Sequence, residues 1–418
     1  MDDSLEITLN TLVYGGEAMG HLPDGRTAFV PCALPGERAR IRLVEEKRGY
    51  VRAKLVEVLM PSAERILPRC RHFGDCGGCH YQHMTHPAQL NAKTEILLDQ
   101  LARIGHIQNP PVNPAISSPQ EWRYRNHVQF HLTRDGKLGY VGAGTGPTPA
   151  VISISECHLP EEPLNALWPG LEFGPGLGLE RLSLRLGAGG EIMLVLESSD
   201  PKPPELEIEA DISVVHLFEG DAVVMAGDKY IFMGINPGRE LPRRMFRISA
   251  ASFFQVNTLM AAKMVEHLFD RLPLKPQSTL LDVYCGVGLF SAFLAAHVGR
   301  LIGIESSPSA CEDFAANLDE FDNVELYEAP AEDVLPALTV KADIAILDPP
   351  RAGLQRRALE GILALRPRRL AYVSCDPATL ARDAAQLVAG GYCLTEVTPF
   401  DLFPQTYAIE SISLFETA

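Results

Sequence analysis

The 418-residue sequence has no N-terminal segment in which basic residues precede an apolar stretch, and no uninterrupted apolar run of 18 residues. A secretory signal would show the first feature and a membrane-spanning helix the second. We therefore expect a cytoplasmic protein that does not contact a membrane. Internal repeats and low-complexity segments are also missing, and 46% of the residues are hydrophobic, so we expect roughly two or three folded domains.

Positive charge is scarce overall. The formal net charge of −16 at pH 7 argues against a protein that is coated uniformly by nucleic acid. The charge is uneven, however, because Lys and Arg outnumber Asp and Glu between residues 38 and 71, whereas acids dominate between residues 156 and 240. A basic N-terminal module is compatible with local RNA binding, although a solvated basic face explains the same pattern equally well.

The spacing of apolar residues divides the chain into several segments. Residues 4–60 alternate apolar and polar positions between Gly and Pro turns, which predicts a small β-barrel with Arg and Lys on one face of its last strands. A cysteine-rich loop over 61–84 precedes an amphipathic helix over about 87–104. Residues 115–250 are predicted to be mostly β structure. From residue 252 onward apolar strands alternate with helices, which is typical of a doubly wound sheet.

Nine cysteines, an odd number, do not suggest a disulfide framework in a cytoplasmic protein. Cys70, Cys76 and Cys79 have the spacing C-x5-C-x2-C in a glycine-rich loop that can wrap around a metal site. A fourth ligand is needed, and Cys157 is the best candidate. The competing side chains are those of His72, His80 and His158. Zinc and an iron–sulfur cluster both fit this donor set, but the C-x3-C-x2-C spacing of radical enzymes is absent.

A strand, a glycine-containing turn and a helix follow one another in residues 278–290, which contain the pattern D-x-x-C-G-x-G starting at Asp282. Such a turn allows a ligand to approach the backbone closely. The next strand ends in Glu305, and an acid at this place can bind both hydroxyls of a ribose. Because the third glycine of a dinucleotide site is missing, the pattern fits S-adenosylmethionine better than NAD.

Further polar groups follow the other apolar strands of this region. Asp348 and Cys375 each stand directly after an apolar run. Ligands of a doubly wound sheet bind beyond the carboxyl ends of its strands. We therefore expect one cleft to be faced by Tyr284, Glu305, Asp348 and Cys375.

Cys375 lies where a strand ends and a helix begins, with Asp376 as the expected N-cap and Pro377 as the first helical residue. The helix N-terminus is expected to favour a thiolate at Cys375. In a methyl-donor cleft, a thiolate that adds to carbon 6 of uracil makes carbon 5 nucleophilic enough to attack the sulfonium methyl group. A base must then remove the proton on carbon 5. Glu410, a carboxylate within the apolar terminal strand, is the predicted base.

Several motifs together resemble the bacterial RNA uracil-5 methyltransferases, and the resemblance covers essentially the whole chain. The motifs are Cys70–Cys79, Phe253–Asn257, Asp282–Gly288, Asp348–Gly353, Val373–Asp383 and Ile409–Ser411. The resemblance implies an α/β protein with a TRAM domain, a small RNA-binding β-barrel, over residues 1–60. It implies a mainly β central domain with a [4Fe-4S] cluster over residues 61–250, and a Rossmann-like methyltransferase domain over residues 251–418. The helix over about 87–104 is expected to pack on that last domain.

The resemblance also implies roles for single residues. Cys375 is the implied nucleophile and Glu410 the implied proton acceptor. The positions implied to contact S-adenosylmethionine are Gln255, Tyr284, Glu305 and Asp348. The implied cluster ligands are Cys70, Cys76, Cys79 and Cys157, and the cluster is expected to order the central domain. One position departs from the family, because Pro330 stands where Asp or Asn often lies near the adenine; Glu332 or Asp333 can substitute.

The implied activity is methylation of carbon 5 of a uridine in RNA by a monomeric enzyme, with 23S rRNA as the first candidate and tRNA as the second. The segments 122–126 and 243–247 interleave aromatic residues and arginines, which suits base stacking and phosphate contact, although strands with exposed arginines have the same pattern. Three alternatives compete with this function. They are an iron–sulfur oxidoreductase or radical enzyme that uses S-adenosylmethionine, a non-catalytic RNA-binding protein, and an adenine amino-methyltransferase.

Overall fold

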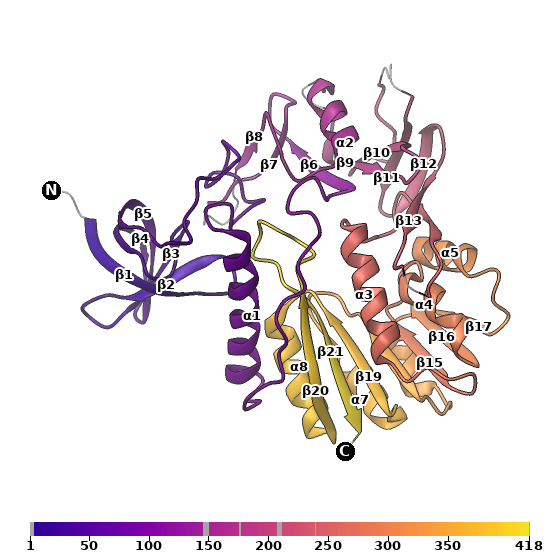
Figure 1. Cartoon of the computed structure of the whole chain (residues 1–418). Helices are drawn as coiled ribbons and strands as arrows, with labels where there is room; N and C mark the ends of the chain where they lie inside the picture. Colours follow the sequence, from indigo (N-terminus) through magenta and orange to yellow (C-terminus); the bar gives the residue numbers. More distant parts are fainter. Residues whose placement is uncertain (1–3, 145–149, 175–176, 207–210, 239, 418) are drawn as a thin grey trace.

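A computed structural model describes residues 4–144, 150–174, 177–206, 211–238 and 240–417. The described chain forms a closed β-barrel, two seven-stranded sheets and a two-stranded sheet. In Figure 1 the barrel lies at the left, the first seven-stranded sheet at the top and the second at the lower right. Across these ranges, no helix has the length and apolar character that crossing a membrane requires.

The N-terminal barrel has the strand order β1-β2-β3-β5-β4 and closes where β1 pairs with β4. Its strands are β1 (Ser4–Leu12), β2 (Glu17–His21), β3 (Thr27–Pro31), β4 (Arg38–Glu46) and β5 (Tyr50–Met60). On β4, Ala39 and Ile41 are buried whereas Arg38 and Arg42 are exposed, because successive residues of a strand point to opposite faces. The predicted barrel with basic residues on one face is confirmed.

The first seven-stranded sheet has the order β12-β11-β10-β9-β6-β7-β8. Its strands are β6 (His127–Leu132), β7 (Leu138–Val141), β8 (Val151–Ser153), β9 (Leu179–Leu186), β10 (Ile192–Ser198), β11 (Ser213–Phe218) and β12 (Asp221–Ala226). The helix α2 (Glu162–Leu167) and the 3-10 turn η1 (Trp168–Gly170) pack against it, because Leu164 and Trp168 share a core with Phe130 and Leu182. The mostly β structure expected over 115–250 is present.

A two-stranded sheet joins this region to the C-terminal part of the chain. It consists of β13 (Tyr230–Ile235) and β14 (Arg244–Ser249), and α3 (Thr258–Arg271) follows it. Ile231 and Phe246 of this sheet belong to one continuous core with Met193 of β10 and Leu280 of the C-terminal sheet. The central sheet is therefore anchored to the C-terminal fold by shared apolar packing.

The second seven-stranded sheet has the order β17-β16-β15-β18-β19-β21-β20, and β21 runs antiparallel to both of its neighbours. Its strands are β15 (Thr279–Val283), β16 (Arg300–Glu305), β17 (Val324–Glu328), β18 (Ile344–Leu347), β19 (Arg369–Ser374), β20 (Tyr392–Phe400) and β21 (Glu410–Thr417). The helical segments between them are α4 (Leu289–Leu294), η2 (Ala295–His297), α5 (Pro308–Asn317), α6 (Ala331–Val334), η3 (Leu335–Ala337), α7 (Arg356–Leu365) and α8 (Pro377–Ala389).

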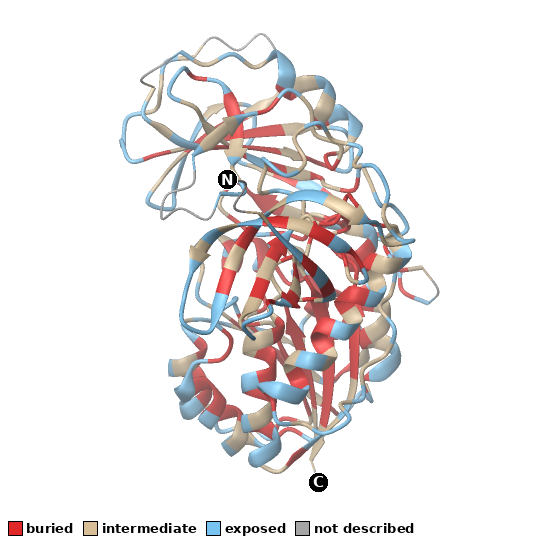
Figure 2. Ribbon diagram, turned by 90° about the vertical axis from the view of Figure 1, so that its left-hand side faces the viewer, coloured by how far each residue is buried: buried red, intermediate tan, exposed pale blue. Residues whose placement is uncertain are grey.

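Helices cover both faces of this sheet. Leu280 and Leu281 are consecutive in β15, yet Leu280 belongs to the core that includes α3 and α4, and Leu281 to the core that includes α7 and α8. In Figure 2 the strands of this sheet are largely red, that is buried, whereas the outer sides of the helices are pale blue. The predicted doubly wound α/β fold is confirmed.

The helix expected near residues 87–104 is α1 (His86–Arg103). Its residues Leu97 and Leu101 lie in the same core as Leu380 and Ala384 of α8. α1 also carries a fully buried cation, since Lys93 is only 1% exposed and donates to Asp401 at 2.7 Å and to the Phe403 carbonyl at 3.0 Å. α1 thus binds the loop between β20 and β21, which leads directly to Glu410.

Substitution of Lys93 by Met is expected to destabilise the protein by about 3–5 kcal/mol, because it leaves a buried carboxylate short of a partner. Burial opposes ionisation of Asp401, but Lys93 and His86 more than offset it and hold the pKa of that carboxyl below its usual value. The measurement is the urea midpoint of the variant. Arg356→Ala, which removes an exposed ion pair with Glu360, is the control and should change stability by less than about 1 kcal/mol. A Lys93→Met midpoint equal to that of the control would contradict this prediction.

Candidate active site and cysteine-lined cavity

The polar groups that follow the strands meet at one edge of the C-terminal sheet. Strand pairing places Tyr284 beside Glu305 and beside Asp348, because Val283 pairs with both Ile304 and Leu347. Ser374 pairs with Ser411, so that Cys375 and Glu410 are neighbours across β19 and β21. Along the edge the order is therefore Glu305, Tyr284, Asp348, Cys375 and Glu410.

This row spans five adjacent strands. Neighbouring strands lie about 4.8 Å apart, so the row is about 20 Å long. The expected cleft-facing groups Tyr284, Glu305, Asp348 and Cys375 all lie at this edge, and Glu410 joins them from the antiparallel strand. The sheet therefore offers one continuous line of functional groups with carboxylates in its first half and a thiol beside a carboxylate in its second.

Glu305 is held firmly by the backbone around it. One carboxylate oxygen accepts hydrogen bonds from the amides of Ser306 (2.7 Å) and Ser307 (2.8 Å), and the other accepts one from Gly286 (2.9 Å). Tyr284 stands at the start of the turn with a φ of 64°, and its amide donates to the Ile304 carbonyl. Hydrogen bonds from the turn that follows β15 and from the residues after β16 thus fix the orientation of both carboxylate oxygens of Glu305.

Asp348 and Glu410 lie in surroundings that disfavour their charge. Burial, then the charges of Asp282 and Glu305, raise the pKa of Asp348 to about 8. Glu410 is only 4% exposed, and burial followed by the charge of Asp348 raises its pKa well above the usual value. Two carboxyls with raised pKa values therefore flank the thiol, as a site for proton transfer requires.

The expectation that the helix N-terminus stabilises a Cys375 thiolate is wrong for the protein alone. Asp376 is the N-cap as predicted. Its carboxylate accepts hydrogen bonds from the backbone amides of Ala378 (3.0 Å) and Thr379 (2.9 Å). These amides therefore donate to a carboxylate rather than to the sulfur of Cys375. Burial, then the charges of Glu410 and Asp348, raise the pKa of Cys375 to about 11. The thiol is therefore protonated until other charges enter the site.

One predicted cofactor position, Gln255, and the departing position Pro330 lie on other segments. Gln255 is buried in the loop before α3, where its backbone carbonyl accepts a hydrogen bond from the side-chain amide of Asn126. Pro330 is the N-cap of α6. Of the two acids that could replace it, Asp333 forms an ion pair with Arg357, whereas the charge of Glu332 contributes, after burial, to raising the pKa of Tyr284 to about 12. Glu332 is thus the acid whose charge acts on a residue of the strand edge.

Arg351 is a functional candidate to which sequence reasoning gave no role. Its positive charge lowers the pKa of both Cys375 and Glu410 and so opposes the effects of burial. The signal was present, because Arg351 stands three residues after Asp348 in the motif 348–353. Its effect on two groups from other strands, however, depends on the sheet order.

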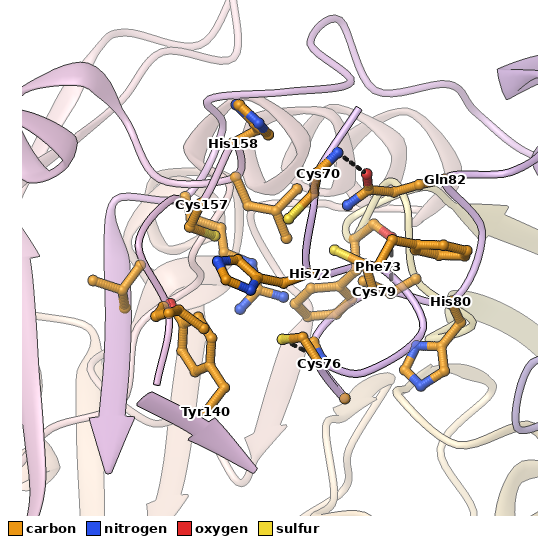
Figure 3. A pocket seen from close by; sticks show the side chains of 18 of the residues that line it. Cys70, His72, Phe73, Cys76, Cys79, His80, Gln82, Tyr140, Cys157 and His158 are labelled. Carbon is orange, nitrogen blue, oxygen red and sulfur yellow. Dashed lines mark hydrogen bonds between the residues drawn. The ribbon is translucent and has the colours of Figure 1, made fainter. Parts of the chain in front are cut away.

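Arg351 also lines a cavity of about 420 Å³ that the four predicted cysteine ligands share (Figure 3). Cys70, Cys76 and Cys79 border this space from one loop and Cys157 from another, with their sulfur atoms directed into it. The cavity continues along the loop Phe403–Ala408 that precedes Glu410. It therefore extends from the cysteines to the segment beside the strand edge.

The cysteine cavity does not present a ready site for a single ion, since no group of three or more His, Cys, Asp or Glu side chains in the described ranges is arranged to hold one. The thiols are nevertheless close enough to interact. Burial is the main reason that the pKa of Cys79 is raised to about 12. A hydrogen bond with Gln82 acts in the opposite direction, and the charge of Cys157 raises the pKa further. Among the competing imidazoles, His72 accepts a hydrogen bond from the Ser155 amide and His80 packs its ring against Tyr407.

The two aromatic and arginine segments are largely structural. Tyr124 is 3% exposed and donates to the Pro404 carbonyl, and Arg125 lies over its ring. In the second segment Arg244 pairs with Glu320, and Arg247 pairs with Asp313. Only the second segment lies on a strand, β14, whereas residues 122–126 form a loop before β6, so the strand explanation applies to the second segment alone.

Comparison with known proteins agrees with this geometry. Residues 4–56 match the TRAM domain family, and residues 238–418 match the family described as tRNA (Uracil-5-)-methyltransferase. An uncharacterized RNA methyltransferase of Thermosynechococcus vestitus is 34% identical over 99% of this chain and 98% of its own length. Another, from Thermotoga maritima, is 32% identical over 97% of both chains. The chain belongs to the RNA uracil-5 methyltransferase family.

Membership of this family makes the protein an S-adenosylmethionine-dependent RNA (uracil-C5)-methyltransferase. A solved structure of the Pyrococcus abyssi tRNA (uracil-54, C5)-methyltransferase in complex with S-adenosyl-L-homocysteine aligns with 98% of this chain and 100% of its own, with a TM-score of 0.72. At 24% identity this likeness establishes the fold of the methyltransferase and not its RNA.

Proposed function

We propose that this methyltransferase modifies carbon 5 of one uridine in 23S rRNA through a covalent adduct between Cys375 and carbon 6 of the base. The observation that carries the proposal is the pairing of Ser374 with Ser411, which brings Cys375 and Glu410 together at the strand edge. Amino methylation of adenine would need neither group. An oxidoreductase would not need a carboxylate placed to take a proton beside the thiol.

The residues would act in sequence. The Cys375 thiolate adds to carbon 6, which breaks the 5,6 double bond and leaves an enolate across carbon 4 and carbon 5. Carbon 5 takes the methyl group from the sulfonium, and the donor leaves as the neutral thioether. Glu410 then removes the proton from carbon 5, the double bond reforms, and the thiolate is released. Arg351 favours the charged forms of both side chains in these steps.

The order of groups along the strand edge supports the placement of the donor. Glu305 and Tyr284 occupy the half of the row away from Glu410, so S-adenosylmethionine would lie across that half with its ribose hydroxyls on Glu305. Asp348 stands between this half and Cys375, and its carboxyl would face the cationic end of the donor. Gln255 and Glu332 would complete the contacts from the loop before α3 and from α6.

S-adenosylmethionine affinity is expected to rise with pH. The pKa of Asp348 is raised to about 8, so at neutral pH a bound cation must displace a proton from this carboxyl. The affinity should therefore increase by up to about tenfold per pH unit below pH 8 and level off above it. Calorimetric titration from about pH 6 to 9 measures this, and Asp348→Asn should flatten the profile. An unchanged slope in the variant would contradict the role of Asp348.

The identity of the RNA substrate is tested by comparing 23S rRNA with tRNA. The barrel and cysteine loop together resemble the large-subunit enzymes, which favours 23S rRNA, whereas the wording of the matched family favours tRNA as the second candidate. Unmodified transcripts of both RNAs are incubated with labelled S-adenosylmethionine, and the methylated nucleotide is mapped by mass spectrometry. We expect 5-methyluridine at one site in 23S rRNA. Label in tRNA alone would replace the proposed substrate but keep the chemistry.

We further propose that Cys70, Cys76, Cys79 and Cys157 hold a [4Fe-4S] cluster. A cluster binds each thiolate through a different iron, so its ligands surround a volume rather than a point, as these thiols do. Four protein thiolates would leave no open iron, so the cluster would supply structure and not methyl-transfer chemistry. Iron and sulfide analysis after anaerobic reconstitution tests this, with Cys76→Ser compared with Cys393→Ser, an exposed cysteine. One zinc per chain would refute the cluster, and chelation without effect on fold and activity would refute its structural role.

A further inference from the structure

Arg125, in the loop before β6, carries a charge that no carboxylate of the described chain pairs with. Its neighbour Arg123 forms an ion pair with Glu162, whereas the Nε atom of Arg125 is buried and has no hydrogen-bond partner. The Arg125 guanidinium lies 5.8 Å from the ring centroids of both Tyr124 and Phe403. These rings attract a cation but supply no negative charge. Because a guanidinium cannot be deprotonated in a protein, Arg125 still requires an anion.

The backbone fixes Arg125 beside the segment that carries Cys157. The Arg125 amide donates a hydrogen bond at 3.0 Å to the carbonyl of Leu159, which stands two residues after Cys157. The hydroxyl of Tyr124 donates at 3.1 Å to the carbonyl of Pro404, in the loop between β20 and β21. Hydrogen bonds to two different segments thus hold this loop, and Arg125 cannot move to the surface without breaking them.

The cavity of about 420 Å³, which Arg125 lines together with the four predicted cysteine ligands, has a single acid among its described lining residues. This acid is Glu156. Its carboxylate accepts a hydrogen bond from the Arg71 amide (2.9 Å) and lies 3.5 Å from the Arg71 guanidinium, so it is already paired. The second arginine of the lining, Arg351, is exposed, and water can solvate its charge. The cysteine thiolates are therefore the remaining anions for Arg125.

We propose that Arg125 is the counter-cation of the metal–thiolate site in this cavity, and that its charge favours both the filling of the site and the reduction of the group bound there. This rests on the proposed [4Fe-4S] cluster. An oxidised cluster with four thiolates carries two negative charges, and one-electron reduction adds a third. A cation held beside the cluster stabilises each of these charges and therefore favours the reduced form most. The unpartnered Nε–H of Arg125 is also free to donate to a sulfur acceptor.

The test compares three variants of the full chain after anaerobic reconstitution with iron and sulfide. Each cluster is reduced stepwise with dithionite, and electron paramagnetic resonance measures the reduced fraction. At the potential where half of the wild-type cluster is reduced, Arg125→Met should have a ratio of reduced to oxidised cluster at least about tenfold lower, a shift of about 59 mV to more negative potential. Arg125→Lys keeps the charge and should stay within about threefold of the wild type. Arg123→Met, two residues away, loses only an exposed ion pair and should match the wild type.

Other results would overturn the proposal. One is an Arg125→Met cluster with the wild-type ratio. Another is the same unchanged ratio with weaker binding of the RNA transcript that the enzyme methylates, which would make Arg125 an RNA contact. If Arg125→Met takes up no cluster, the comparison moves to loading at equal thermal midpoints. A filled site in Arg125→Lys would then support the need for charge, whereas an empty site in both variants would show that the shape of arginine matters and not its charge.

A failure of the cluster itself would be recognised separately. A wild-type chain that holds zinc would refute the [4Fe-4S] cluster, but zinc with four thiolates also carries two negative charges. In that case Arg125→Met should weaken zinc binding at least about tenfold in competition with a chelator, and Arg125→Lys should not. Zinc affinity that is equal in Arg125→Met and the wild type would remove the counter-cation as well.

Discussion

Replacement of Cys375 by Ser is expected to abolish turnover and to remove a covalent enzyme–RNA complex. With RNA containing 5-fluorouridine, the wild-type enzyme should form an adduct that survives a denaturing gel, because fluorine cannot leave carbon 5 as a proton does. The alcohol of serine is a far weaker nucleophile than a thiol. Loss of the covalent step should therefore reduce the rate by about 10⁴-fold or more.

The control for this experiment is a second cysteine in the same domain. Cys393 is exposed on β20, away from the strand edge, and Cys393→Ser should form the adduct at the wild-type rate. An adduct of undiminished intensity in Cys375→Ser would show that another nucleophile attacks the base. A Cys375→Ser enzyme with substantial methylation of ordinary RNA would remove the covalent mechanism altogether.

The rate of adduct formation should also rise with pH in the wild-type enzyme. Burial and the neighbouring carboxylates raise the pKa of Cys375 to about 11 in the protein alone, so the reactive thiolate is scarce at neutral pH. The thiolate fraction grows about tenfold per pH unit below that value. Bound S-adenosylmethionine brings positive charge beside Asp348 and should move the profile to lower pH, so the comparison with and without the donor measures this coupling.

The sequence predicts this site well wherever function depends on the end of a strand. Apolar runs identify β15, β16, β18 and β19, and a residue that directly follows such a run lies at the carboxyl edge of a parallel sheet. Glu305, Asp348 and Cys375 were placed correctly for this reason. The capping of α8 by Asp376 is equally local and was predicted from two consecutive residues.

Properties that arise between distant segments were not predicted. The pKa of Cys375 depends on Glu410, which reaches it only because β21 inserts between β19 and β20. Lys93 lies on an amphipathic helix, where a lysine is normally exposed, and only the docking of α1 on the loop at Asp401 explains its burial. The packing of Tyr14 on Tyr407 likewise depends on how the barrel sits on the rest of the protein, which no local pattern encodes.

Substitution of Glu410 by Gln is expected to stop the enzyme after methyl transfer. Gln has the same shape and cannot accept the carbon 5 proton, so the methylated base stays bound to Cys375. Turnover should fall by about 10²–10⁴-fold, the usual contribution of a general base. Mixing the variant with S-adenosylmethionine and ordinary RNA should give one methyl group per enzyme and a covalent complex without any fluorine.

A loss of folding should not account for the reduced turnover of Glu410→Gln. Glu410 is buried and its pKa is raised, so a neutral amide replaces a group that already resists ionisation. The variant should be at least as stable as the wild type at neutral pH. Glu416→Gln, on the same strand but partly exposed and paired with Arg369, is the control and should turn over normally. Accumulation of the methylated adduct in Glu410→Gln, together with its absence in Glu416→Gln, would identify the base. Wild-type turnover in Glu410→Gln would assign the proton to another acceptor, and Asp348, whose charge already acts on both Cys375 and Glu410, would then be the next carboxylate to replace.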